Sequence, residues 1–305
     1  MDGPDRPTSR RALLGGVGTA IVGGLAGCAG VVGQIGRAPP MVSVLAAGSL
    51  AHLFETRLRE AVQPHLQIEA HGSATVARLV ADGQRDPDVV ALADTGLFGR
   101  LLPVPFYATV ATNALVLAYN PRTAGGRRVR DADAPFAPFR ADDPPALGRT
   151  DPDLDPLGYR TRFALELAGA RADDPALARE VLAGSRVYPE TELLARFETG
   201  AVDAAVVYRT MAAERGYPSR ILPAGIDLSA PDMADHYATR SYRLPDGTVV
   251  DGDVIRYGAT LRRTAPAPTR VFEALADGGL LAAGGFEVPD RYPEYVGDVP
   301  ERLRD

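Results

Sequence analysis

The sequence predicts an α/β fold with two lobes, because segments typical of strands and helices alternate along the chain in two separate series. Short apolar runs that end in glycine or aspartate indicate buried strands, and apolar residues spaced three and four apart indicate helices. A chain of 305 residues is long enough for two lobes with substantial cores. Since open α/β sheets bind ligands beyond the carboxyl ends of their strands, we expect a ligand cleft between the lobes.

The first series begins with MVSVLAAGSL (41–50), which is typical of a strand ending in Gly-Ser, and a helix is predicted over 50–62. The same order of strand, Gly-Ser and helix returns in LQIEAHGSATVARLVADG (66–83). A continuously apolar strand is predicted in PDVVALADTGLF (87–98) and another strand in ATNALVLAYNP (111–121). This alternation favours a parallel sheet in the first lobe.

The second series follows a stretch rich in Pro, Arg and Asp (121–145) and begins with helices predicted over 158–170 and 175–183. The later segments are a strand, turn and helix in SRVYPETELLARFETG (185–200), a strand ending at Tyr208 plus a helix in VDAAVVYRTMAAERG (202–216), strands in RILPAGIDL (220–228) and VIRYGATLR (254–262), and a helix over 268–283. We expect lobe 1 to comprise 41–112 plus 263–305 and lobe 2 to comprise 113–262. The two crossing segments are expected near 111–118 and 256–264.

Composition excludes several classes of function. The formal net charge of −6 argues against nucleic acid as a partner, because phosphate binding requires a basic face. A single cysteine, Cys28, excludes a disulfide framework or a cysteine zinc site within the chain, and the four histidines show no spacing typical of a metal site.

The amino-terminal residues have the pattern of an export signal. Arg10 and Arg11 precede an apolar, glycine-rich run over 12–26, which is shorter than the roughly 20 residues of a membrane span but fits a signal peptide. A twin arginine at this position is typical of Tat export. The run ends in Leu-Ala-Gly-Cys, which resembles a lipobox. We therefore expect residues 1–27 to be removed, Cys28 to carry a lipid, 28–40 to form a tether, and the protein to be anchored on the outer face of the cytoplasmic membrane.

Two serines are candidates for binding an anion. Ser49 and Ser73 each follow a glycine at the end of a predicted strand and open a predicted helix. A serine at this position is an N-cap by default. The start of a helix also presents free N–H groups and a partial positive charge, which suit an anion. Both interpretations remain open from the residues alone.

The acidic stretch GRTDPDLDPLGYR (148–160) places carboxylates at every second position, at Asp151, Asp153 and Asp155. A calcium loop of the EF-hand type is excluded, because Pro156 stands where that loop requires glycine. The stretch can be a solvated acidic loop in which Asp151 caps the turn, or it can belong to a ligand site.

The sequence gives no argument for catalysis. It contains no G-x-S-x-G elbow and no glycine-rich phosphate loop. A secreted hydrolase that uses Asp151 or Asp155 with Glu190 as an acid/base pair remains an alternative, as does a binding protein for sulfate or phosphate.

Five segments together resemble the molybdate/tungstate-binding proteins of ABC transporters, in particular the archaeal-type tungstate/molybdate branch. They are AAGSL (46–50), GSATVARLVADGQRDPDVVALAD (72–94), GRTDPDLDPLGYR (148–160), YPETELLARFETGAVDAAVVYRTMA (188–212) and VIRYGATL (254–261). The resemblance implies the two-lobed periplasmic-binding-protein fold of type II. It also implies a monomer without a cofactor, which captures tungstate or molybdate and delivers it to an ABC permease.

The resemblance also implies roles for individual residues. Ser49 and Ser73 match serines that hydrogen-bond the oxyanion from the first lobe, and Tyr208 matches a tyrosine that lines the site from the second lobe.

In the archaeal-type branch two carboxylates bond the metal of the oxyanion directly and raise it from four-coordinate to six-coordinate. Glu190 matches the glutamate of this pair and Asp155 best matches the aspartate, with Asp151 as the alternative. Such a pair distinguishes ligands, because sulfate and phosphate cannot expand their coordination and two ionised carboxylates would repel them.

Overall fold

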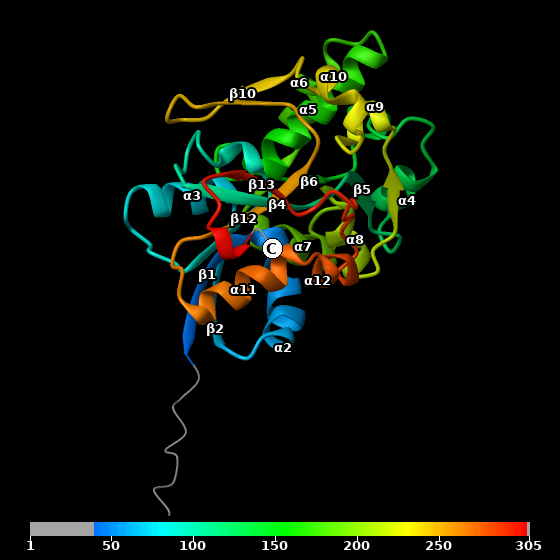
Figure 1. Ribbon diagram of the computed structural model, residues 1–305. Coiled ribbons are helices and arrows are strands. Elements are labelled where there is room, and N and C mark those ends of the chain that lie inside the picture. The colour runs from blue at the N-terminus through cyan, green and yellow to red at the C-terminus, as the bar shows by residue number, and fades with distance from the viewer. Residues whose placement is uncertain (1–39, 304–305) are drawn as a thin grey trace, which may run out of the picture. The chain divides into compact units, whose positions relative to one another are not determined.

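The computed structural model describes residues 40–303, whose strands form two main sheets and one hairpin (Figure 1). The first sheet has six strands in the order β13-β4-β12-β3-β1-β2, and the second has five in the order β7-β6-β8-β5-β9. Helices accompany the strands of both sheets. These observations confirm the predicted α/β fold with two lobes.

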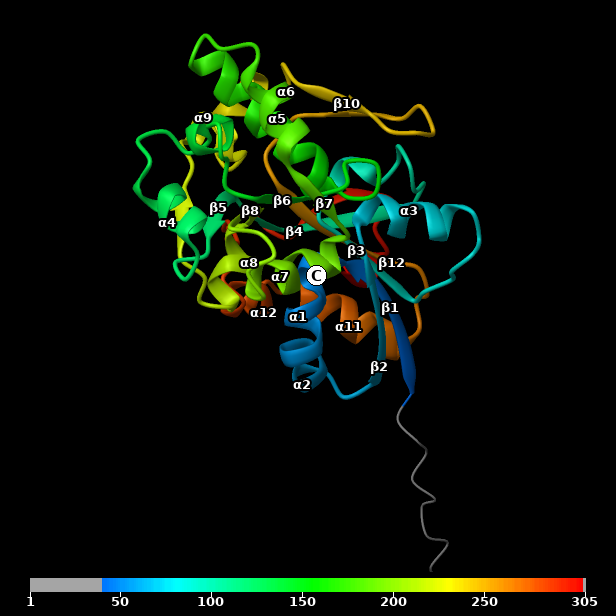
Figure 2. The same ribbon diagram turned by 180° about the vertical axis from the view of Figure 1, so that it is seen from behind.

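The first sheet is parallel in one half and antiparallel in the other. Its parallel strands are β1 (Met41–Ala47), β2 (His65–His71) and β3 (Val89–Leu92), and β1 and β2 run side by side in Figure 2. The strands β4 (Phe106–Thr112), β12 (Arg256–Leu261) and β13 (Glu294–Gly297) pair in antiparallel fashion. The expectation of a parallel sheet is therefore wrong for the second half, where β12 returns from the other lobe, β13 belongs to the C-terminal tail, and both pair with β4 in antiparallel fashion.

The helical segments of the first lobe follow β1, β2 and β3 and return after β12. After β1, the short segments η1 (Gly48–Leu50), α1 (Ala51–Leu53), η2 (Phe54–Leu58) and α2 (Arg59–Ala61) together realise the helix predicted over 50–62. The others are α3 (Ser73–Ala81), η3 (Thr95–Leu97), α11 (Pro266–Ala276), α12 (Gly279–Ala283) and η6 (Glu301–Leu303).

The second sheet consists of β5 (Leu115–Tyr119), β6 (Leu147–Thr150), β7 (Arg186–Tyr188), β8 (Ala204–Tyr208) and β9 (Ser219–Ile221). Its long helix α5 (Pro156–Arg171) begins where Asp155 caps it and Pro156 takes the first helical position, which is a favourable start for a helix. The other helical segments are α4 (Ala124–Asp131), η4 (Ala137–Arg140), α6 (Leu177–Gly184), α7 (Glu190–Glu198), α8 (Arg209–Glu214), α9 (Ala224–Asp227), η5 (Pro231–Met233) and α10 (Ala234–Tyr237).

Two crossings join the sheets, and they lie side by side. The chain leaves β4 at Thr112 and enters β5 at Leu115, so the single strand predicted over 111–121 is the end of one strand and the whole of the next. It returns at Ile255, whose carbonyl accepts a hydrogen bond from the Asn113 N–H at 3.2 Å. The segment 256–261, which the sequence-based division assigned to lobe 2, is hydrogen-bonded within the first sheet.

Some predicted elements need correction. Of the strand predicted over 220–228, only β9 is a strand, because Pro223 lacks an N–H for strand pairing and the helical turn α9 follows it. The helix predicted over 268–283 is broken between α11 and α12 at Gly278, whose φ of +76° favours glycine. The hairpin of β10 (Ser241–Arg243) and β11 (Val249–Asp251) was not predicted.

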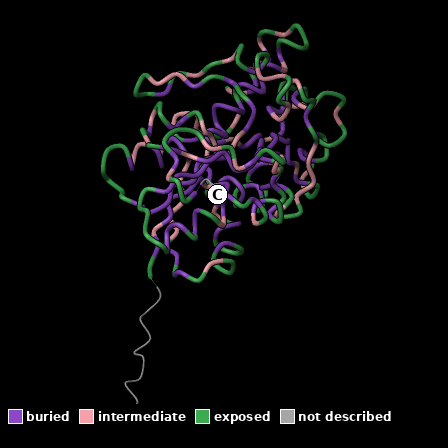
Figure 3. The backbone as a smooth tube through the Cα atoms, viewed as in Figure 1, coloured by how far each residue is buried: buried purple, intermediate pink, exposed green. Residues whose placement is uncertain are grey.

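Buried apolar side chains form one continuous cluster through both lobes. Figure 3 shows the buried backbone in the interior and the exposed backbone mainly in the outer loops. Within residues 40–303, no helix has the length and apolar character needed to cross a membrane.

Candidate functional site

The two Gly-Ser turns lie next to each other at one edge of the first sheet. Strands β1 and β2 are parallel neighbours, and Ala47 at the end of β1 is opposite His71 at the end of β2. Gly48-Ser49 and Gly72-Ser73 therefore leave the sheet at the same carboxyl edge, and both serines are buried. The structure brings the two predicted serines together, as the repeated pattern suggested.

Neither serine caps its helix, so the default N-cap interpretation is wrong for both. Ser73 Oγ accepts a hydrogen bond of 2.9 Å from the Ala93 N–H, and Ser49 Oγ is 3.0 Å from the hydroxyl of Tyr257, which donates to it. A backbone N–H can only donate, so the hydroxyl proton of Ser73 remains available for another acceptor.

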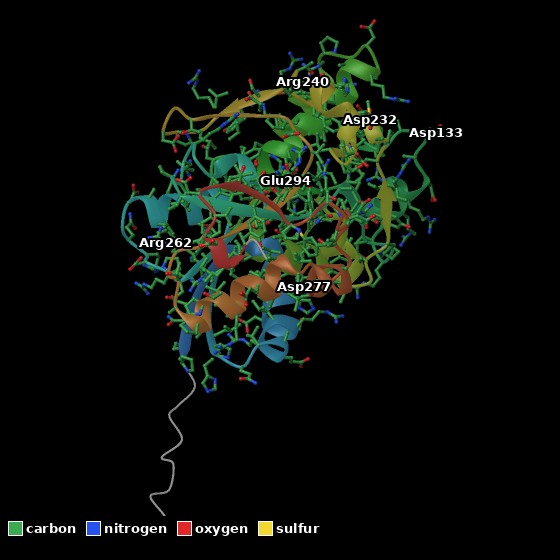
Figure 4. All side chains as sticks on the ribbon, viewed as in Figure 1. Asp133, Asp232, Arg240, Arg262, Asp277 and Glu294 are labelled. Atoms are coloured by element: carbon green, nitrogen blue, oxygen red, sulfur yellow. The ribbon has the colours of Figure 1, made fainter. Side chains whose placement is uncertain are left out.

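Two carboxylates stand at the starts of two helices of the second lobe. Asp155 precedes α5 and Glu190 is the first residue of α7, and their exposed fractions are only 1% and 5%. Asp155 Oδ1 accepts hydrogen bonds from the N–H groups of Leu157 (2.6 Å) and Gly158 (3.3 Å). Both carboxylate oxygens of Glu190 are buried without a hydrogen-bond partner of good geometry. Most charged side chains instead lie at the surface, as Figure 4 shows for Asp133 and Arg262.

Each Gly-Ser turn faces one of the carboxylates at very short range. A Cβ atom added at Gly48 would lie 2.6 Å from Glu190 Oε2, and one added at Gly72 would lie 2.3 Å from Asp155 Cβ and 2.5 Å from the Leu154 carbonyl oxygen. A side chain at Gly72 would meet the backbone of Leu154, and one at Gly48 would require the end of the Glu190 side chain to move. The two glycines therefore permit the close approach of the lobes around the site.

The carboxylates are electrostatically unfavourable neighbours. Burial raises the pKa of Asp155 to about 7, even though the hydroxyl of Thr150 and the N–H groups of Leu157 and Gly158 oppose the shift. Burial and then the charge of Asp155 raise the pKa of Glu190 well above its usual range. Two ionised carboxylates without a cation between them are costly to bury. The site therefore favours either a shared proton or a ligand with an electron-poor centre.

Tyr208 ends β8 and reaches the same region from the second lobe. It is fully buried, and its hydroxyl oxygen accepts a 2.8 Å hydrogen bond from Arg160 Nη1. Its ring packs edge-on against Tyr257 with 5.9 Å between ring centroids. Arg160 and Tyr257 lie in segments 148–160 and 254–261, but the sequence pattern predicted no role for either residue.

Asp151 lies in the turn and caps it, as the solvated-loop interpretation predicted. It is only half-buried, and its Oδ1 accepts a 2.9 Å hydrogen bond from the Asp153 N–H, which caps the turn. The charge that raises the pKa of Glu190 is that of Asp155. Asp155, rather than the half-buried Asp151, is thus the buried carboxylate that faces a Gly-Ser turn as Glu190 does. Cys28 and the signal segment 1–27 lie outside the described residues.

A cavity of about 160 Å³ borders the site on the Glu190 side, with Gly48 and Ser49 in its wall. Larger cavities of about 590 and 720 Å³ lie elsewhere and contain none of the predicted site residues. Over residues 40–303, no three His, Cys, Asp or Glu side chains gather in a way that could hold a metal cation. The donor set is two carboxylates and several hydroxyl groups, all oxygen.

Comparisons with known proteins agree with this architecture. Residues 42–276 match the family described as bacterial extracellular solute-binding protein. A protein of Haloferax volcanii, named as a candidate molybdenum-binding protein of an ABC transporter, is 55% identical over 96% of both chains. A molybdate/tungstate-binding protein of Thermococcus kodakarensis is 27% identical over 78% of this chain and 76% of its own length.

Among solved structures, the periplasmic molybdate-binding protein of Azotobacter vinelandii is similar in fold. The TM-score is 0.54 at 14% identity, and the match covers 82% of this chain and 100% of that protein. This likeness confirms the predicted periplasmic-binding-protein fold.

Proposed function

The chain belongs to the family of bacterial extracellular solute-binding proteins, and on that premise we propose that it captures tungstate or molybdate and delivers the oxyanion to an ABC permease. The family consists of exported transport proteins, which argues against the acid/base hydrolase considered from the sequence. The names of the Haloferax and Thermococcus relatives support the ligand class.

The observation that carries the proposal is the buried pair Asp155 and Glu190. A carboxylate beside an anion repels it unless the carboxylate bonds the central atom. The metal of tungstate or molybdate is a hard, highly charged centre that prefers oxygen donors. One oxygen of Glu190, whose carboxylate has no hydrogen-bond partner of good geometry, and Oδ2 of Asp155 would supply two further oxygens and raise the metal to six-coordinate.

The hydroxyl groups would hold the oxo groups of the ligand. Ser49 and Ser73 approach from the first lobe and Tyr208 from the second. The oxygens of Ser73 and Tyr208 already accept hydrogen bonds from an N–H group, so each hydroxyl can donate its own proton to the anion. The site would thus contact the ligand through metal–carboxylate bonds and through donated hydrogen bonds.

Calorimetric titration with tungstate, molybdate, sulfate and phosphate tests this proposal. We expect tight binding of tungstate and molybdate and weak binding of the other two, since neither can accept the carboxylates. X-ray absorption should show six oxygen neighbours around the bound metal. A four-coordinate spectrum, or sulfate binding as tight as tungstate binding, would contradict the carboxylate mechanism.

We further propose that the protein is a monomeric lipoprotein. Cleavage after residue 27 and a lipid on Cys28 would hold it at the outer face of the membrane through a tether over 28–40. Mass spectrometry of membrane-extracted protein should find the mature chain beginning at lipidated Cys28. An unmodified chain that keeps residues 1–27 in its native host would refute this part.

For the lobes we propose a division at the two crossings. Lobe 1 holds the first sheet with α11 and α12, and lobe 2 holds the second sheet with α5 and α7. The boundaries at 112 and 263 expected from the sequence change at the second crossing, because β12 pairs with β3 and β4.

A further inference from the structure

Arg160, on α5 of the second lobe, is the only buried basic side chain among residues 40–303, with an exposed fraction of 4%. Its Nη1 donates to the Ala93 carbonyl oxygen at 2.6 Å and to the Tyr208 hydroxyl oxygen at 2.8 Å. Its Nη2 lies 3.4 Å from Asp94 Oδ2. Ala93 and Asp94 follow β3 of the first lobe and Tyr208 belongs to the second, so one guanidinium group bonds both lobes.

The same guanidinium is connected to two proposed ligand-binding hydroxyls, to that of Tyr208 directly and to that of Ser73 through Ala93. The Ala93 residue that accepts from Arg160 through its carbonyl also donates its N–H to Ser73 Oγ. Tyr208 is bonded to Arg160 directly. Because guanidinium and backbone N–H groups cannot accept, both hydroxyl oxygens act as acceptors towards the protein and keep their protons for the oxyanion.

The guanidinium also supplies the positive charge that the site otherwise lacks. Its field lowers the pKa of Asp155 against the effect of burial. Desolvation alone would lower the pKa of Arg160, but Tyr208, Asp94 and Tyr159 outweigh it and keep the group charged. The guanidinium of Arg160 thus offsets part of the negative charge of the two carboxylates and of a bound divalent oxyanion.

We propose that Arg160 is a positioning residue that couples oxyanion capture to lobe closure. The proposal rests on the proposed function. The bonds from Arg160 to Ala93 and Asp94 exist only when the lobes are together, and they hold Ser73 and Tyr208 in the orientation that donates to the ligand. An anion bound beside the guanidinium therefore favours the closed arrangement over any open one.

The chain offers a matched control. Arg78, on α3, also bonds across the lobes, donating to the Asp153 carbonyl oxygen at 2.7 Å and to Asp246 at 3.1 Å. Its side chain is about one quarter exposed, and its bonds do not reach the proposed ligand-binding residues. The Arg78 variant therefore shows the effect of losing a cross-lobe bond away from the site, and the Arg160 variants show the effect of losing one beside the site.

The experiment compares the wild type, Arg160→Gln, Arg160→Lys and Arg78→Gln, with tungstate as the probe. Affinity is measured by calorimetry, and closure by small-angle scattering or by energy transfer between one dye on each lobe. We expect the wild type and Arg78→Gln to close on tungstate with affinities within a few-fold. Arg160→Gln should bind at least 100-fold more weakly and stay open when saturated.

Arg160→Lys separates charge from geometry and carries the test if Arg160→Gln does not fold. Lysine keeps the charge but lacks the planar fork that reaches Ala93 and Tyr208 together, so we expect about tenfold weaker binding and incomplete closure. Normal affinity and closure in Arg160→Lys and Arg160→Gln would overturn the proposal. A wild type that does not respond to tungstate would instead refute the proposed function.

Discussion

The candidate site has two halves, one formed by Gly48-Ser49 and Glu190 and the other by Gly72-Ser73 and Asp155. The two halves have the same arrangement, but different hydrogen bonds hold their side chains. In each half, a Gly-Ser turn of the first sheet faces a carboxylate at the start of a helix of the second lobe. Backbone groups hold the Asp155 half, since Asp155 accepts from two N–H groups and Ser73 accepts from a third. In the Glu190 half, the carboxylate has no partner of good geometry.

Two further features distinguish the Glu190 half. Ser49 is bonded to a side chain, that of Tyr257, and the cavity of about 160 Å³ borders Glu190. The Asp155 half is thus preorganised before a ligand arrives. The Glu190 half contains a buried carboxylate without a hydrogen-bond partner of good geometry, which a proton or a ligand with an electron-poor centre would satisfy.

Replacing the carboxylates should have the largest effect. Glu190→Gln and Asp155→Asn each remove a charged donor at nearly constant shape, and each should weaken tungstate binding well beyond the tenfold that corresponds to about 1.4 kcal/mol. Sulfate affinity should rise in both variants, because a repelling charge is lost. Calorimetry measures both changes. If only one variant binds tungstate more weakly, then a single carboxylate bonds the metal. The two halves would then differ in how they contact the ligand as well as in their hydrogen bonds.

Adding one methyl group to each turn should separate the halves further. In Gly72→Ala the new Cβ meets the backbone of Leu154, whereas in Gly48→Ala it meets the movable end of Glu190. We expect Gly72→Ala to weaken tungstate binding by about 1–3 kcal/mol, as overpacking does, and Gly48→Ala to weaken it less. Gly184→Ala, which meets nothing within 4 Å, is the control. Equal losses at both turns would show that the Glu190 side is as rigid as the Asp155 side.

The pH dependence of the free energy of unfolding should report the raised pKa values of Asp155 and Glu190. Both carboxyl pKa values are raised by folding, so the ligand-free native state keeps protons that the unfolded chain releases above about pH 4. The free energy of unfolding should fall as pH rises towards 7, by up to about 1.4 kcal/mol per pH unit for each proton. Asp155→Asn should flatten this fall up to about pH 7, and Glu190→Gln should flatten it as well, because each variant removes one of the carboxyl groups whose pKa is raised by folding. Denaturant titrations between pH 5 and 9 measure the slopes, and a pH-independent wild type would contradict the burial argument.

The serines should give the smallest effects. Ser49→Ala and Ser73→Ala each remove one hydrogen bond and should weaken all oxyanions alike, by about 0.5–1.5 kcal/mol and up to about 3 with a charged partner. Tyr257→Phe frees Ser49 from its side-chain partner and should cost less than Ser49→Ala. Competition binding with molybdate measures these differences. If a serine variant weakens the binding of only one anion, that serine contributes to the ligand specificity of the site.

The sequence predicted the positions of the site residues better than the hydrogen bonds that connect them. Gly-Ser turns at strand ends are local patterns, so the positions of Ser49 and Ser73 followed from the chain itself. Arg160 bonds Tyr208 across 48 residues, and Tyr257 bonds Ser49 across 208. No periodicity reports such contacts, which is why neither Arg160 nor Tyr257 received a role.

The fold shows the same limit. Strands with long apolar runs, such as β3, β5 and β8, were predicted because burial on both faces leaves a strong pattern. The short strand β13 has mostly exposed residues and pairs with β4 from the far end of the chain, so its pattern carried no such signal. The hairpin β10–β11 had an Asp-Gly turn at 246–247 that would have predicted it.

The side-by-side crossings also determine how the protein can open. Since the Asn113 N–H donates to the Ile255 carbonyl oxygen, the two connections between the sheets are tied at one point. We therefore expect the lobes to rotate about a hinge near this hydrogen bond rather than to slide or separate. Displacement in such a rotation grows with distance from the axis, as in a lever. Reporter groups placed far from Asn113 will therefore register opening most strongly, and groups beside it will scarcely move.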